Sequence, residues 1–281
     1  RGNRSISGDS QPLYIVDGVP ANGISDINPD DVASINVLKG PNAAALYGNR
    51  ANNGAIILTT KKGTKGGMSV NVNTSFMMDQ PILLTNYQNV YGQGNTGVYS
   101  PSAETSWGPR MDGQQVAHWS PNPAWPEATY ALSPQPDNVR DFFQTGHNLA
   151  TTLSISSGNE TNQTYFSYTY TDAAGVVPGN ELARHSLNLR FTNQLSKRLT
   201  LDSKVNYIRE HIDNQLQQGE NFLNPIRHAY RIPRNIRTSD FEQFEYIDAA
   251  GSAFQNYLAP KSNGGANPYW TINRNLRENT D

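Results

Sequence analysis

The sequence predicts a membrane β-barrel, antiparallel and incomplete in this chain, preceded by a small α+β domain. Three observations support this prediction. Five segments alternate apolar and polar residues, and the connections between them are alternately very short and very long. Residues 1–66 differ, because they contain short strand-like runs separated by turn and helix-cap signals. Because successive strand residues point to opposite faces, each alternating segment gives a sheet one apolar side and one polar side. The five segments are residues 68–77, 149–157, 164–171, 186–193 and 199–208.

The last segment shows the alternation clearly. Its apolar positions are Leu199, Leu201, Val205 and Tyr207, and its polar positions are Thr200, Asp202, Lys204 and Asn206. We expect the apolar positions to face lipid and the polar positions to face the barrel lumen, as in outer-membrane barrels. The lumen side then carries Arg190, Asp202 and Lys204, whose charges must be neutralised against whatever fills the lumen or against water.

The connections between the segments indicate the compartment and the orientation. Residues 158–163 and 196–198 form tight turns, whereas residues 79–148 and 210–281 each run to about seventy residues. Outer-membrane barrels have short turns on the periplasmic side and long loops outside the cell. We therefore expect residues 79–148 and 210–281 to be long extracellular loops.

The bulk properties exclude several classes. A net charge of −2 gives no electrostatic case for binding nucleic acid. The absence of Cys excludes disulfides and thiol–zinc sites. A mean hydropathy of −0.63 suits a barrel, whose strands place only every second residue against lipid. Five strands cannot close and a bilayer tolerates no open sheet edge, so we expect the remainder of the barrel to lie outside this chain, in a longer protein.

Strand-like runs in the first 66 residues are ended by turn signals. Residues 13–16 end at Asp17-Gly18, residues 35–38 end at Gly40-Pro41, and residues 55–60 lie between Gly54 and Gly63. Two short helices carry capping signals. Asn28 can act as N-cap before Pro29, and Gly48 can supply a left-handed C-cap for residues 42–47. A basic, flexible hinge at residues 61–67 then leads into the first alternating segment.

Longer motifs in the same region resemble the SusC/RagA-like family of TonB-dependent transporters. The resemblance covers residues 1–66 densely and residues 140–210 more loosely. Gly40-Pro41 departs from the Asp-Ala pair common in that family, which leaves room for a different substrate branch. The matching motifs are PLYIVDGVP at 12–20, INPDDVASINVLKG at 27–40, AAALYGNRANNGAIILTTKKG at 43–63, FQTG at 143–146 and RHSL at 184–187.

The resemblance implies a plug domain inside a transmembrane barrel. Residues 1–66 would be the C-terminal part of the plug, and residues 67–281 the N-terminal part of a 22-stranded barrel. The protein would lie in the Gram-negative outer membrane of a member of the Bacteroidota. It would import oligosaccharides or oligopeptides with a SusD-like surface lipoprotein, driven by TonB through a region absent from this chain. Outer-membrane lipids and the remainder of the same barrel would be its other partners.

Three rival functions remain. A TonB-dependent siderophore or corrinoid receptor would share the plug and the barrel. A secreted carbohydrate-binding β-sandwich would be soluble and would have no plug-like domain. A surface hydrolase would turn over its substrate without TonB. A SusD-like lipoprotein that copurifies with the protein would favour the importer.

Nothing in the sequence indicates catalysis, a cofactor or a metal. The five histidines have no pair at a metal-ligand spacing such as i, i+4. Two carboxylate pairs could be imagined for glycoside hydrolysis, Glu242 with Glu245 and Asp202 with Asp213. Solvated loop or lumen carboxylates are the better interpretation of both. We therefore expect a protein that is not an enzyme.

Candidate contact residues lie in the loops and in the plug. Four loop aromatics could offer flat faces to sugar rings or a partner protein, or could pack the loop onto itself: Trp107, Trp119, Trp125 and Tyr130. Four plug residues could touch cargo, or could serve turn geometry: Tyr47, Asn49, Arg50 and Asn53. Four loop arginines could contact an anionic ligand, although a solvated loop face is favoured: Arg227, Arg231, Arg234 and Arg237.

The alternation predicts how a charge is tolerated on each face. Leu189→Arg should impair barrel assembly by about 2–4 kcal/mol near the middle of the bilayer, because it places a cation in hydrocarbon. Asn188→Arg, on the opposite face, should be far milder. Heat-resistant folding in detergent or vesicles measures both variants, and equal losses would contradict the strand assignment.

Overall fold

The computed structural model describes residues 11–21, 23–24, 27–258 and 265–275. The first ten residues of the predicted plug and the last six of the predicted second loop lie outside the described residues. The chain forms two compact units. The plug–wall unit comprises residues 1–75, 150–171 and 184–209, and the loop unit comprises residues 76–149, 172–183 and 210–281.

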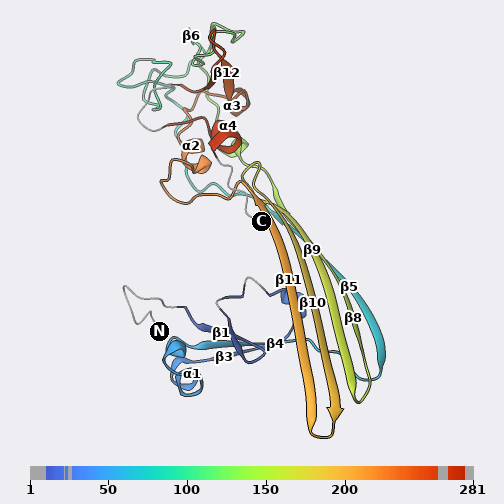
Figure 1. The fold of residues 1–281 in the computed structure, drawn as a ribbon. Coiled ribbons are helices and arrows are strands. Elements are labelled where there is room, and N and C mark those ends of the chain that lie inside the picture. Colours follow the sequence, from blue (N-terminus) through green and yellow to red (C-terminus); the bar gives the residue numbers. More distant parts are fainter. Residues whose placement is uncertain (1–10, 22, 25–26, 259–264, 276–281) are drawn as a thin grey trace. The chain divides into compact units, whose positions relative to one another are not determined.

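A four-stranded sheet forms the centre of the N-terminal domain (Figure 1). Its strand order is β2-β1-β4-β3. Strand β1 pairs in parallel with β4, and the two other pairs are antiparallel. The strands are β1 (Leu13–Val16), β2 (Val19–Ala21), β3 (Val32–Leu38) and β4 (Ala55–Thr60).

The turn between β1 and β2 lies where the Asp17-Gly18 signal predicts it. Both residues have positive φ, 49° for Asp17 and 88° for Gly18, as the twist of a two-residue hairpin requires. The predicted N-cap is also confirmed. The Asn28 side chain accepts a hydrogen bond from the backbone N of Asp30 at 3.1 Å and starts a single 3-10 turn, η1 (Pro29–Asp31).

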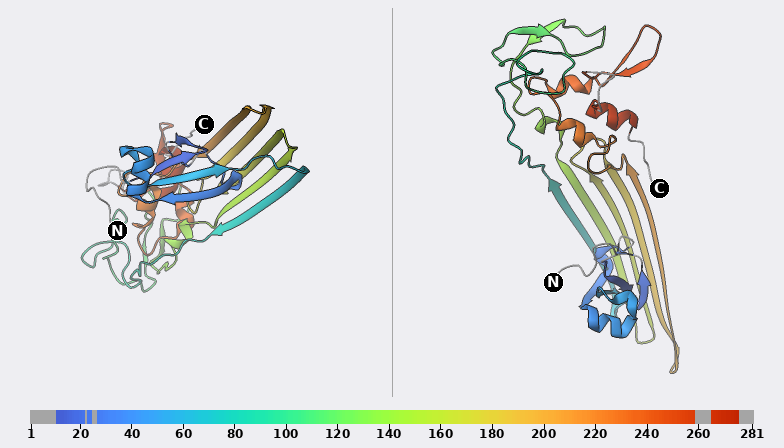
Figure 2. Two further views of the ribbon diagram at one scale, coloured as in Figure 1. Left: turned by 90° about the horizontal axis from the view of Figure 1, so that it is seen from below. Right: turned by 90° about the vertical axis from the view of Figure 1, so that its left-hand side faces the viewer.

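Helix α1 (Gly40–Tyr47) begins two residues before its predicted start, because Pro41 fits the first helical turn, and the strand before it ends at Leu38 as predicted. Gly48 caps the helix with φ 71° but ψ −161°. That conformation differs from the predicted left-handed cap and is open essentially only to glycine. A short 3-10 turn, η2 (Asn49–Ala51), follows. Figure 2 shows α1 beside the small sheet, and the core between them contains Leu13, Ile15, Ala43, Ala51 and Ala55.

Five long strands form a second sheet, here called the wall sheet, with the order β11-β10-β9-β8-β5 and alternating directions (Figures 1 and 2). Each strand covers one of the five predicted segments and is longer than it. The alternation stops near the end of β11, where Arg209, His211 and Asp213 occupy the parity of Leu201 and Val205, but the strand continues. The strands are β5 (Gly67–Asp79), β8 (Gly146–Gly158), β9 (Asn162–Ala174), β10 (Glu181–Ser196) and β11 (Leu199–Asp213).

The two faces of the wall sheet have the polarity expected beside lipid. Apolar side chains of the outer face are exposed, and many polar side chains of the inner face on β8, β9 and β10 are buried. Met68 is 73% exposed, whereas Ser167 is 1% exposed. Exposed outer-face residues include Val70, Val72, Tyr168, Tyr170, Phe191, Leu199, Leu201, Val205 and Tyr207. Buried inner-face residues include Thr152, Ser156, Thr169, Ser186, Asn188 and Arg190. A sheet whose outer face met water would reverse this pattern.

The loop unit is compact although it consists mainly of the two predicted long loops. Its short elements surround one core that contains Trp119, Phe142, Ile236, Phe241 and Tyr257. The elements are β6 (Gln115–Ala117), β7 (Thr129–Ala131), η3 (Arg140–Phe142), α2 (Pro225–Ala229), α3 (Thr238–Glu242), β12 (Glu245–Ile247), β13 (Ala253–Gln255), α4 (Pro268–Trp270) and η4 (Thr271–Asn275). In the described part of the chain, each helix is too short or too polar to cross a membrane.

Burial changes one half of the charge-placement prediction. Asn188 is 2% exposed on the inner face, so an arginine there has no room and Asn188→Arg cannot be the mild control. Asn206 lies on the same parity of β11 and is exposed. We expect Leu189→Arg to impair folding as described above and Asn206→Arg to fold like the wild type. The same heat-resistance measurement compares them.

Candidate functional site

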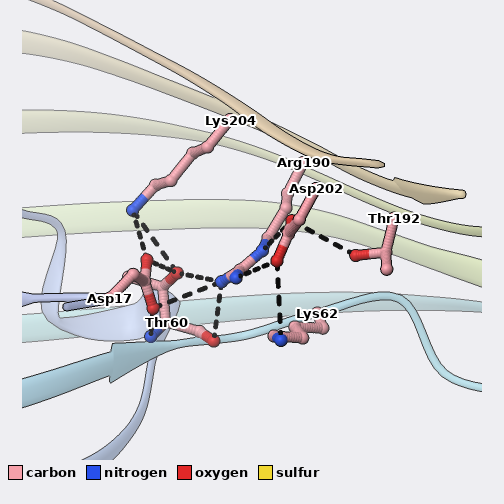
Figure 3. Close-up of polar contacts among 7 residues, drawn as sticks. All are labelled: Asp17, Thr60, Lys62, Arg190, Thr192, Asp202 and Lys204. Atoms are coloured by element: carbon pink, nitrogen blue, oxygen red, sulfur yellow. Dashed lines mark hydrogen bonds and ion pairs between the residues drawn. The ribbon is translucent and has the colours of Figure 1, made fainter. Parts of the chain in front are cut away.

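A cluster of charged and hydroxyl side chains joins the N-terminal domain to the inner face of the wall sheet (Figure 3). This charge cluster brings together the β1–β2 turn, the end of β4 and the strands β10 and β11. Its members are Asp17, Thr60 and Lys62 from the N-terminal domain and hinge, and Arg190, Asp202 and Lys204 from the wall sheet.

Asp17 is the centre of the charge cluster. Within its own domain its carboxylate accepts hydrogen bonds from the Thr60 hydroxyl at 2.6 Å and from the Thr60 backbone N at 2.9 Å. Towards the wall it lies 3.2 Å from Arg190 Nη1 and 3.2 Å from Lys204 Nζ. Both carboxylate oxygens therefore have one partner in the domain and one in the wall.

Arg190 links Asp17 to an acid of the wall itself. Its guanidinium donates to both oxygens of Asp202, from Nε at 3.0 Å and from Nη2 at 2.7 Å. The remaining nitrogen, Nη1, donates to the Thr60 hydroxyl at 2.9 Å and faces Asp17. The side chain is only 7% exposed. Such a planar fork fits a carboxylate in a way that lysine cannot.

The environment of Asp17 keeps it ionised. Burial alone would raise the pKa of Asp17, but the hydrogen bonds from Thr60 and from Lys204, with the positive charge of Lys204, lower it to about 2. The predicted neutralisation of Arg190, Asp202 and Lys204 is thus confirmed: the plug acid Asp17 faces the two cations, and Asp202 pairs with Arg190 and with Lys62 of the hinge. The sequence pattern around Asp17 predicts only its place in a turn. The surplus of wall cations was the signal that an acid should face them.

A second set of contacts joins η1 to the wall sheet through neutral donors. The Thr152 hydroxyl donates to Asp30 at 2.5 Å, and the Tyr165 hydroxyl donates to Asp31 at 2.9 Å. Tyr165 is an aromatic residue on the polar parity and is 3% exposed. Its position on the inner face gives it a polar partner, which explains why an aromatic side chain departs from the alternation.

The hinge packs closely against the wall sheet at Gly63. A Cβ at this position would lie 2.7 Å from the carbonyl oxygen of Thr164 and 2.8 Å from that of Ser157. Real Cβ atoms are essentially never so close to backbone. Gly63 therefore allows the chain to leave the N-terminal domain in contact with the wall. Thr64, the next residue of the hinge, also contacts the wall: its hydroxyl lies 2.9 Å from the hydroxyl of Ser156.

The plug residues predicted to contact cargo lie close together. Asn49, Arg50 and Asn53 line a hollow of ≈640 Å³ in the N-terminal domain, next to Tyr14. Tyr47 instead packs against the domain core. The structure thus brings three of the four residues to one hollow, and their contact with cargo stays a prediction.

Three of the four predicted loop aromatics gather around His118. Its ring lies 4.8 Å from Trp125, 5.0 Å from Tyr130 and 5.4 Å from Trp119, measured between centroids. Burial lowers the pKa of His118 to about 4, so the ring is neutral. Trp119 is 2% exposed, whereas Trp107 lies apart and is 60% exposed. Trp107 therefore offers the largest open aromatic face of the four, and its role stays a prediction.

The favoured interpretation of the loop arginines as a solvated face is wrong for Arg234, which is 3% exposed. Its guanidinium donates to neutral oxygens of the other long loop. These include the Pro136 carbonyl at 2.7 Å, the Asn89 side chain at 3.0 Å and the Asn138 side chain. The Tyr87 ring lies 4.8 Å from its Cζ. Arg234 thus holds two sequence-distant loops together, a role that its neighbouring residues do not reveal.

Metal-ligating groups do not converge in the part of the chain that the structure describes. There, no three His, Asp or Glu side chains are placed to hold a metal ion.

The geometry is that of a small plug-like domain bound to the inner face of a membrane-barrel wall, and comparisons with known proteins agree. Residues 1–55 match the family model of the TonB-dependent Receptor Plug Domain. The chain is 28% identical over 249 residues to TonB-dependent receptor P39 of Formosa agariphila, covering 86% of this chain and 22% of that receptor. It is 29% identical over 199 residues to TonB-dependent receptor SusC of Bacteroides thetaiotaomicron, covering 67% of this chain and 18% of SusC.

Solved structures show the same fold. The RagAB peptide importer in its open-open state superposes with a TM-score of 0.63 at 20% identity, over 96% of this chain and 31% of that chain. Its closed-closed state gives a TM-score of 0.62. Together these findings support a fragment of a SusC/RagA-like TonB-dependent receptor, and the chain spans about a fifth of the length of the curated relatives described above. The plug-domain match and the exposed outer face argue against a secreted β-sandwich.

The charge cluster should resist separation of plug and wall. Asp17→Asn removes the charge that Arg190 and Lys204 face, so we expect faster proteolysis of the N-terminal domain in a receptor carrying this segment. A double-mutant cycle with Lys204→Met should give a coupling of about 1–2 kcal/mol. Lys65→Ala removes an exposed ion pair with Glu160 and should change nothing measurable. Equal proteolysis rates for Asp17→Asn and Lys65→Ala would contradict the role of the cluster.

The low pKa of Asp17 gives the cluster a defined pH dependence. Because the pKa is lower in the folded state, about 2 against 3.8 in the unfolded chain, the stabilisation is present above pH 3.8. It is lost as the pH falls towards 2, and its size is about 2 kcal/mol. Denaturant unfolding of wild type and Asp17→Asn should therefore differ at neutral pH and converge between pH 4 and pH 2. A difference that persists unchanged at pH 2 would contradict this assignment.

Arg234 should determine the stability of the loop unit. Arg234→Lys leaves several buried oxygens without donors, and we expect a loss of about 3 kcal/mol or more. Arg237→Lys is the matched control, because Arg237 is 53% exposed and forms an ion pair with Asp240, three residues away. Thermal unfolding monitored by Trp fluorescence measures both variants. Similar melting temperatures would show that Arg234 is not the link between the loops.

Proposed function

We propose that the receptor containing this segment imports oligosaccharides or oligopeptides across the outer membrane without changing them chemically. The observation that carries the proposal is the charge cluster. It attaches a small folded domain to the inner face of a membrane wall through ion pairs and hydrogen bonds, not through an apolar interface. Polar contacts can exchange with water, so a plug held in this way can be displaced and can return.

In this proposal the barrel has 22 strands and the plug closes its lumen. Energy for displacing the plug comes from TonB, acting on a part of the receptor other than the described residues. The wall satisfies its backbone hydrogen bonds internally and exposes apolar side chains to outer-membrane lipid. The matched family of outer-membrane receptors supports this localisation.

A SusD/RagB-like surface lipoprotein is the proposed partner of the loop unit. The relationship to SusC and the likeness to the RagAB structures support this partner. Trp107 is its most exposed predicted contact, because an open aromatic face can pack against a protein or a sugar ring. Within the plug, Asn49, Arg50 and Asn53 are the proposed cargo contacts, since they line one hollow.

Two measurements test the proposal. Affinity purification of a tagged receptor from its native outer membrane should retain a surface lipoprotein in equimolar amount. Cells should also take up fluorescein-labelled peptides from a casein digest, or labelled oligosaccharides from a plant-polysaccharide hydrolysate, and uptake should stop when a protonophore is added. Uptake of an iron–siderophore complex alone, without a copurifying lipoprotein, would favour the rival receptor class instead.

A further inference from the structure

The plug is attached to the inner face of the wall sheet in two chemically different ways. Towards β10 and β11 it uses the charge cluster, in which Asp17 faces two wall cations. Towards β8 and β9 it uses neutral wall donors, the hydroxyls of Thr152 and Tyr165, which bind Asp30 and Asp31. The free energy needed to separate plug from wall therefore differs between the two attachments.

A cavity of ≈670 Å³ lies between the plug and the wall, next to the contact of Thr152 with Asp30. The plug and hinge contribute Asp30, Lys61 and Lys62 to its lining. The wall contributes hydroxyl and amide side chains, among them Ser69, Asn71, Asn73, Thr152, Ser154 and Ser156. We call this cavity the polar crevice. It can hold many water molecules, each of which takes about 30 Å³ in the liquid.

A second hollow, of ≈520 Å³, borders the charge cluster. Its wall side is lined by Arg190, Asp202 and Lys204, together with Asn206. Opening at this hollow requires the separation of Asp17 from two cations, and the buried guanidinium of Arg190 would keep Asp202 but lose its contacts with Asp17 and Thr60. Opening at the polar crevice requires hydroxyl groups to exchange a carboxylate partner for water, and the solvent-exposed ion pair of Lys65 with Glu160 to separate.

We propose that the passage for cargo opens at the polar crevice, with the plug turning about the charge cluster as a pivot. The hydroxyl and amide groups of the wall can replace water around a cargo that donates and accepts hydrogen bonds. This chemistry fits uncharged sugar hydroxyls and peptide groups better than an apolar or iron-chelate cargo. The inference rests on the proposed function, because only an importer requires the plug to yield.

Thiol labelling tests where the passage opens without any need for the natural cargo. The chain contains no Cys, so one introduced thiol is unique in this segment. Ser154→Cys places it in the polar crevice, and Asn206→Cys places it in the hollow beside the charge cluster. The probe is a membrane-impermeant maleimide, added to intact cells with and without a protonophore.

We expect energised cells to label Ser154→Cys several-fold faster than cells treated with the protonophore, and to label Asn206→Cys at an unchanged rate. Acceleration at Asn206→Cys alone would place the opening beside the charge cluster and would overturn the proposal. Equal rates at Ser154→Cys in both conditions would also overturn it.

A disulfide gives a second, independent measurement. Asp30→Cys with Thr152→Cys would tie η1 to β8 and close the polar crevice; in the wild type the Thr152 hydroxyl oxygen lies 2.5 Å from an Asp30 carboxylate oxygen. Thr64→Cys with Ser156→Cys is the matched control, because it ties the hinge to a wall residue that it already contacts. Oxidation should stop uptake of labelled casein peptides only in the first pair, and a reductant should restore it, which verifies folding. Uptake that survives oxidation of the first pair would contradict the crevice route.

The two proposals can fail separately. Energised labelling at Ser154→Cys in cells that take up neither peptides nor oligosaccharides would contradict the proposed cargo and support the crevice. Uptake of either probe without a change in labelling would support the proposed function and contradict the crevice.

Discussion

The polarity of the wall sheet is the constraint on which the rest of the structure depends. Apolar side chains occupy the outer face, so every second residue of each strand must direct a polar side chain inwards. Some of these inner groups, such as Arg190 and Asn188, are almost fully buried. A buried charge requires a partner, and the N-terminal domain provides it through Asp17. The composition of the plug surface therefore follows from the medium on the opposite side of the wall.

A polar interface also explains how a folded domain can be both held and released. Apolar surface contributes about 25 cal/mol for each Å² removed from water, and an apolar plug surface would make separation correspondingly costly. Hydrogen bonds and ion pairs instead exchange partners with water. In this segment the two kinds are separated in space, with ions at the β1–β2 turn and hydroxyl contacts at η1. Such a division gives the interface a strong side and a weak side.

The loop unit applies the opposite principle. Its two long loops bury aromatic residues such as Trp119 and Phe241 in a common core, and the buried Arg234 binds neutral oxygens across it. Loops of this length are ordinarily functional or disordered. The shared core makes them a rigid support, which can present an exposed residue such as Trp107 in a fixed position.

The sequence by itself determined the five strands of the wall sheet, their faces, the Asp17-Gly18 turn and the Asn28 cap. Alternation reports which medium a side chain meets, and the Asp17-Gly18 turn and the Asn28 cap depend only on neighbouring residues. The inward position of Arg190, Asp202 and Lys204 followed from parity alone. The tertiary structure decided the partners: that Asp17 faces Arg190, that Tyr165 points inwards to Asp31, and that Arg234 is buried. Each of these contacts joins residues that are far apart in the sequence. No local sequence pattern indicates such a contact, because only the three-dimensional fold brings the two residues together.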